Sequence, residues 1–124
     1  MADIVSKNIV YSLEPRLYEV FAKYTVGGSG ALTVVNCPYI TSVTRNGAGD
    51  YSFLFRDVWN ECLDVKITLK STTASTYVAQ IHTDSLNSAK TLRVVLTVGG
   101  SATDPTNGAT AYFHFVLKNS KEMV

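Results

Sequence analysis

The sequence carries little charge. Only 17% of its 124 residues are Asp, Glu, Lys or Arg, and the formal net charge is +1, whereas about a quarter of the residues in an ordinary soluble domain are charged. A chain without an excess of basic residues has no electrostatic means of binding nucleic acid or an anionic membrane. The sequence therefore predicts neither partner, and it indicates a surface that is either rich in Ser and Thr or meant to be covered by other molecules.

Cysteine is almost absent as well. Cys37 and Cys62 are the two in the chain, and they share no metal-site spacing with each other or with the two histidines. A zinc site needs more ligands at closer spacing. We therefore expect two reduced, buried thiols, with a disulfide as the alternative, and neither a metal nor another cofactor.

Long apolar runs are also missing. None approaches the roughly 20 residues of a membrane-spanning helix, and the first residues, MADIVSKNIV, lack the cationic region and apolar stretch of a signal peptide. We expect synthesis in the cytoplasm. The length of 124 residues fits one domain, which at this size buries about two thirds of its unfolded surface.

What the sequence does contain is alternation. Tyr51, Phe53 and Phe55 fall at every second position, and similar runs follow at 65–70, 92–98 and 111–118. A period of two is typical of β-strands, because successive side chains point to opposite faces of a sheet. Turn-forming segments lie between the runs, among them the Gly-rich 27–30, the hairpin turn 46–50 and the long loop 99–108.

The expected fold is an all-β, single-domain antiparallel β-sandwich, jelly-roll-like, with a small barrel as the alternative. Residues 17–124 form this domain, and residues 1–16 are an extended N-terminal arm or an edge strand. Residues 14–24 fit helical spacing as well as alternation, and their Tyr, Val and Phe favour a strand. Residues 57–62 fit no period and predict a loop or a single helical turn. About eight strands are expected, near 17–26, 31–36, 39–45, 50–56, 64–70, 76–82, 91–98 and 110–118.

Groups that could catalyse a reaction are scarce. His82 and Asp84 would share one face of a strand and could form a weak acid–base pair, but a surface histidine is the preferred interpretation. His114 lies between Phe113 and Phe115 and is expected to be partly exposed or at an interface, where it could make association sensitive to pH. Asp104, which precedes Pro105, is interpreted as a turn former. We therefore expect that the protein is not an enzyme.

Two groups of residues are candidates for a partner interface. Tyr39 and Trp59 stand in poorly periodic segments and could be exposed, and Tyr and Trp often anchor interfaces. The arm carries apolar residues among polar ones and could add a strand to the sheet edge of a neighbouring molecule, with an edge strand or a frayed end as the alternative. These arm residues are Ile4, Val5, Ile9 and Tyr11.

A set of segments in a fixed order resembles a known family. They are GGSGALTVV at 27–35, YITSVTRNGAGDYSFLFRD at 39–57, VKITLKSTT at 65–73 and SAKTLRVVLTVGGSATDPTNGATAYFHFVLKNS at 88–120. Together they resemble the small all-β virion proteins of tailed bacteriophages, among them capsid decoration or cement proteins, over residues 17 to 120. The resemblance carries no catalytic residues.

The resemblance implies a structural virion protein, made in the host cytoplasm and placed on the outer capsid surface. There it would bind the major capsid protein and stabilise the particle, as a homo-oligomer for which a trimer is favoured. The alternative is a host-receptor or glycan-binding module of a tail fibre or spike, with Tyr39, Trp59 and the loop 99–109 as its site. Another tail or neck component is a further alternative.

Overall fold

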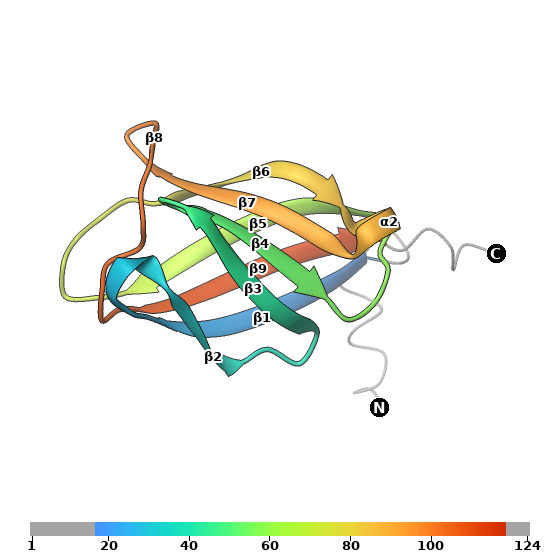
Figure 1. The fold of residues 1–124 in the computed structure, drawn as a ribbon, viewed down its shortest axis with the longest axis horizontal. Helices are drawn as coiled ribbons and strands as arrows, with labels where there is room; N and C mark the ends of the chain where they lie inside the picture. Colours follow the sequence, from blue (N-terminus) through green and yellow to red (C-terminus); the bar gives the residue numbers. More distant parts are fainter. Residues whose placement is uncertain (1–16, 119–124) are drawn as a thin grey trace, which may run out of the picture.

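The computed structural model describes residues 17–118, which form two antiparallel β-sheets packed face to face (Figure 1). In the first sheet the strand order is β2 (Leu32–Asn36), β1 (Leu17–Val26), β9 (Thr110–Lys118), β5 (Glu61–Lys70). In the second it is β3 (Ile40–Gly47), β4 (Asp50–Phe55), β7 (Thr91–Val98), β6 (Val78–Ser85), and the short β8 (Ser101–Ala102) also pairs with β7. A 3-10 turn, η1 (Gly28–Gly30), and a single-turn helix, α2 (Leu86–Ala89), complete the described elements.

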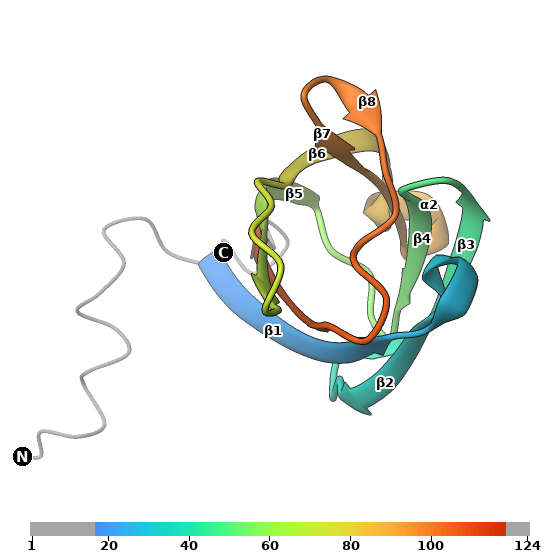
Figure 2. The same cartoon turned by 90° about the vertical axis from the view of Figure 1, so that its left-hand side faces the viewer.

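The predicted all-β sandwich is confirmed. Within residues 17–118 the two sheets share no hydrogen-bonded pair of strands, so the fold is a sandwich rather than a closed barrel. Figure 2 shows β1 and β5 on one side of the core and β3 and β4 on the other. The strand orders do not by themselves make the sandwich a jelly roll. The strand expected at 17–26 is present, so alternation outweighs the helical spacing in that segment.

Three details of the strand prediction are wrong. A ninth described strand, the two-residue β8, lies in the segment 99–108 that was expected to be a loop. β5 begins at Glu61, inside the segment expected to be a loop or a helical turn, because a bulge between Cys62 and Asp64 breaks its alternation. A similar irregularity lies between Ile81 and Thr83 in β6, which runs to Ser85 instead of ending at residue 82. Period counting fails at a bulge, since one extra residue reverses which face each later side chain occupies.

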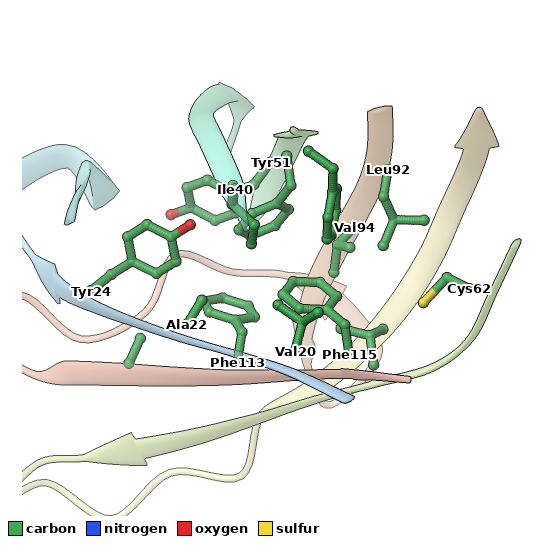
Figure 3. Packing of buried hydrophobic residues seen from close by; sticks show 14 of the residues in the cluster. Val20, Ala22, Tyr24, Ile40, Tyr51, Cys62, Leu92, Val94, Phe113 and Phe115 are labelled. Atoms are coloured by element: carbon green, nitrogen blue, oxygen red, sulfur yellow. The ribbon is translucent and has the colours of Figure 1, made fainter. Parts of the chain in front are cut away.

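Aromatic rings from both sheets fill the core (Figure 3). The ring of Phe53 in β4 lies edge-on to Phe113 and Phe115 of β9, with centroid distances of 5.1 and 5.3 Å. All three side chains are fully buried, as the sequence predicts. Such edge-to-face pairs add about 0.5–1.5 kcal/mol each beyond the burial of their area.

The cysteines are not bonded to each other. Cys62 is buried and Cys37 is only half-buried, so the expectation of two buried thiols is confirmed for the first and wrong for the second. Burial raises the pKa of the Cys62 thiol to about 12, which keeps it protonated and unreactive at neutral pH.

Candidate interaction surface

Of the six residues predicted to contact a partner, four lie outside the residues that the structure describes: Ile4, Val5, Ile9 and Tyr11. The prediction of an N-terminal arm at 1–16 also falls there. Trp59 and Tyr39 are described, and the structure places them in different environments.

The suggestion that Trp59 could be exposed is wrong. Its side chain is only 9% exposed; its ring packs 5.2 Å from that of Tyr18, and its backbone N–H donates to the carbonyl of Leu86. A large apolar ring in the connection between β4 and β5 helps to close this end of the sandwich. The segment lacks a period because it is a crossover between sheets, not because it is a surface loop.

Tyr39 is exposed, as predicted, with 48% of its surface accessible. It sits in a turn before β3 that is held on several sides. The Ile40 N–H donates to the Cys37 carbonyl, the Arg56 N–H donates to the Tyr39 carbonyl at 3.0 Å, and Arg56 Nη1 donates to the Pro38 carbonyl at 2.7 Å. Because the turn is fixed before any partner arrives, binding through Tyr39 would cost little ordering of the backbone.

β2, which precedes this turn in the chain, carries further exposed apolar side chains. Val34 and Val35 are each 50% exposed, and among the described strands β2 pairs only with β1. Val35 is the extra residue of a bulge: it lies between Val34 and Asn36, which pair with Tyr24 and Lys23 of β1. We call Val34, Val35 and Tyr39 together the β2–β3 edge.

Exposed edge strands usually carry a charged residue or a proline, which prevents them from pairing with other chains. The five residues of β2, LTVVN, include neither. The β2–β3 edge therefore has half-exposed apolar side chains and a strand guarded by a bulge alone, without charge or proline, which is typical of a surface that a partner covers.

The suggested pairing of His82 with Asp84 is absent. His82 Nδ1 contacts the Thr83 hydroxyl at 2.7 Å. The Asp84 carboxylate instead accepts from the backbone N–H groups of Cys62 at 2.7 Å and Leu86 at 3.1 Å. Asp84 thus ties β6 to the start of β5 and to α2, and its role is structural.

Asp104 is the residue whose role the sequence did not reveal. Its carboxylate accepts two hydrogen bonds from Arg45, at 3.1 and 2.7 Å, and one from the Gly49 N–H at 2.8 Å. The Tyr51 hydroxyl lies 3.3 Å away and also donates to the Gly30 carbonyl at 2.6 Å. The Arg45 guanidinium, helped by the Gly49 N–H, holds the pKa of the Asp104 carboxyl below its usual value.

This cluster fixes the loop 99–109 to the β3–β4 hairpin. The Asp104 carbonyl accepts a further hydrogen bond, 2.9 Å long, from the Tyr77 hydroxyl. Gly30 has φ +75°, and a Cβ there would lie 2.5 Å from the Asp104 carboxyl carbon, so only glycine fits. The loop proposed from the sequence as a receptor site is thus anchored at its centre by buried and half-buried groups.

His114 is half-exposed, in agreement with the prediction. Its Nε2 lies 3.0 Å from Glu19 Oε1, and its ring stacks on Phe21 with centroids 4.5 Å apart. Both neighbours belong to β1, so this contact lies on the outer side of the first sheet.

No cluster of three or more His, Cys, Asp or Glu side chains is placed to hold a metal ion within residues 17–118. In the same residues there is no helix of the length and hydropathy that crossing a membrane requires. A scan against protein-family models found no match, and searches of curated proteins and of solved structures found no significant similarity.

Proposed function

We propose that the protein is a structural virion protein whose activity is adhesion, in the manner of a capsid decoration or cement protein. It would bind the outer capsid lattice through the β2–β3 edge and stabilise the particle without catalysing a reaction. The observation that carries the proposal is the uncharged edge strand with Val34, Val35 and Tyr39 each about half exposed. The sequence resemblance to phage virion proteins supplies the setting, with the major capsid protein as partner.

The physical basis is burial of apolar surface. Each Å² removed from water contributes about 25 cal/mol before the costs of association are subtracted. One small edge gives a weak contact, but on a lattice many copies and several contacts per copy act together through effective concentration. A surface with few charges suits this role, because few charged groups lose their hydration.

A binding experiment tests the proposal. The purified chain is added to expanded phage capsids that lack their decoration protein, and bound protein and capsid melting temperature are measured. We expect saturable binding and a higher melting temperature. Failure of the wild-type chain to bind any such capsid at micromolar concentration would overturn the proposal.

The Val35→Lys variant assigns the contact to the edge. Lysine protects an edge strand, and at a half-exposed bulge position it should leave the fold intact while lowering capsid affinity at least ten-fold. The matched control is Val78→Lys in β6, where Val78 is 57% exposed in a strand at the edge of the second sheet. Equal losses in both variants would remove the β2–β3 edge as the binding surface.

Receptor or glycan binding is the second candidate, and the fixed, exposed ring of Tyr39 favours it. A preorganised aromatic ring is a good anchor for a ligand with an apolar face. A glycan screen with wild type and Tyr39→Ala would support this candidate if binding depends on the ring. It would leave cementing as the function if no glycan binds.

Self-association belongs to the proposal as well. The resemblance favours a trimer, and the expected place is the virion surface after synthesis in the host cytoplasm. Light scattering on the purified chain would measure the number of chains in the assembly.

A further inference from the structure

The outer side of the first sheet carries exposed aromatic rings on its two middle strands. Phe21 of β1 is 62% exposed, the largest fraction among the large apolar side chains described, and it stacks on His114 of β9. Beside this pair, the Lys23 ammonium lies over the ring of Tyr112, 5.7 Å from its centroid. No other described segment covers the outer side of β1 (Figure 2).

Charges on this face are sorted along the strand direction. The pairing register gives three successive rows that point outward from β1, β9 and β5, since every second residue points to the same face. The rows are Glu19–Val116–Asp64, then Phe21–His114–Lys66, then Lys23–Tyr112–Thr68. On β1 an acidic residue therefore precedes Phe21 by two positions and a basic residue follows it by two. We call these nine residues the outer face.

This arrangement is self-complementary. Consider a second copy placed face to face on the first by a two-fold axis. The axis lies in the contact plane, runs along the Phe21–His114 row and is therefore perpendicular to the strands. Rotation about it reverses the strand direction of the second copy. Glu19 of each copy then faces Lys23 of the other, and the two Phe21 rings meet between these ion pairs. Because the two pairs are equivalent, the same surface patch serves both copies, as a two-fold contact requires.

We propose that the outer face binds a second copy of this chain through such a two-fold contact. Apolar burial at Phe21 gives the attraction, and the paired charges fix the orientation, since the reverse alignment would place Glu19 against Glu19 and Lys23 against Lys23. The two Lys66 side chains also approach each other across the axis. Each is offset by the carboxylate of Asp64, with which it forms an ion pair.

The contact is a different surface from the β2–β3 edge and does not depend on capsid binding. A closed ring of three chains has no two-fold axis between its members. The proposal therefore predicts an even number of chains: two, or two trimers joined face to face.

Charge exchange tests the geometry. Light scattering at pH 7.5 and low salt should give an even multiple of the chain mass, 13.5 kDa. Glu19→Lys and Lys23→Glu should each weaken association at least ten-fold, because both reciprocal pairs become repulsive. An equimolar mixture of the two variants should associate again, since every contact between unlike chains then joins a lysine to a glutamate.

Control variants separate this effect from net charge and from apolar surface in general. Asp57→Lys makes the same charge change as Glu19→Lys, at an exposed position away from the outer face. It should leave the mass of the assembly unchanged. Phe21→Ser should dissociate the assembly, whereas Val78→Ser, at a residue that is 57% exposed, should not. A wild-type chain that is monomeric at millimolar concentration, a trimer unaffected by the charge variants, or a mixture that stays dissociated would each overturn the proposal.

Discussion

Replacing Asp104 by alanine should destabilise the fold through one backbone group. The carboxylate is the acceptor for the N–H of Gly49, at 2.8 Å, and Gly49 is buried in the turn between β3 and β4. A buried donor that loses its acceptor costs about 1–3 kcal/mol. The Tyr51 hydroxyl keeps its second partner, the Gly30 carbonyl, so it adds little to this cost.

The ion pair with Arg45 should contribute less than its short distances suggest. The Arg45 side chain is 35% exposed, and pairs that face water are weakened by solvent and by salt. We therefore expect Asp104→Ala to lower the free energy of unfolding by about 2 kcal/mol, through the unpaired backbone donor. For a domain of this length that is a fall in melting temperature of about 6–10 °C.

Urea and thermal unfolding, followed by circular dichroism and Trp59 fluorescence, would measure the loss. The matched variant is Arg45→Gln, which removes the ion pair and leaves the carboxylate to accept from Gly49. It should cost much less than Asp104→Ala. The reasoning is refuted if Arg45→Gln costs as much, or if Asp104→Ala changes the stability by less than about 0.5 kcal/mol, below the cost of an unpaired donor.

The Asp104 carboxylate should also make the free energy of unfolding depend on pH in the acid range. The pKa values of Asp104 and Asp50 are lowered in the folded state, chiefly by the hydrogen bonds from Arg45 and Arg93. A depressed pKa means that the stabilisation is complete above the unfolded value of about 3.9 and is lost as pH falls through the folded value. Wild type should therefore hold its stability between pH 7 and 5 and lose it below about pH 4. Asp104→Ala should show a shallower fall, and equal acid profiles would contradict this assignment.

Three further predictions concern glycine, the core and the thiols. Gly49→Ala should lower the free energy of unfolding by about 2 kcal/mol or more, because φ is +66° and a Cβ would lie 2.6 Å from the Thr103 nitrogen. Gly108→Ala, at positive φ in open space, should lower it by about 1–2 kcal/mol. Equal losses of the two variants in urea unfolding would argue against the close approach at Gly49. Phe53→Ala should cost about 3–5 kcal/mol, and a loss below 1 kcal/mol in the same assay would mean that the ring is not part of a packed core. In a Cys37→Ser background, Cys62, whose pKa burial raises to about 12, should react with a thiol reagent at pH 8 only after denaturant is added, so rapid labelling of the folded chain would contradict its burial.

Alternation was sufficient to find the main strands and much of the core. Phe53, Phe113 and Phe115 stand at every second position of their runs, and each is fully buried between the sheets. The inference works because a strand with one buried face must alternate. It failed at β5 and β6, where bulges shift the register and no local composition marks them.

Burial outside regular strands could not be inferred from sequence. Trp59 lies in an aperiodic segment, and whether such a residue is exposed depends on what packs against it. Tyr18, whose ring packs on that of Trp59, and Leu86, whose carbonyl accepts from its backbone N–H, are 41 and 27 positions away in the chain. Tyr39, in an equally irregular segment, meets no such cover among residues 17–118 and remains half exposed.

The sequence by itself determined that this chain is an all-β sandwich with few charges, since alternation and composition are local properties that a single sequence records. Only the tertiary structure decided which surfaces stay open and which polar groups meet. Arg45 and Asp104 are 59 residues apart, and Glu19 and His114 are 95, so both contacts depend on how the strands are ordered within each sheet. The β2–β3 edge and the outer face follow from that order, because it sets which strand is left at an edge and which side chains share a row.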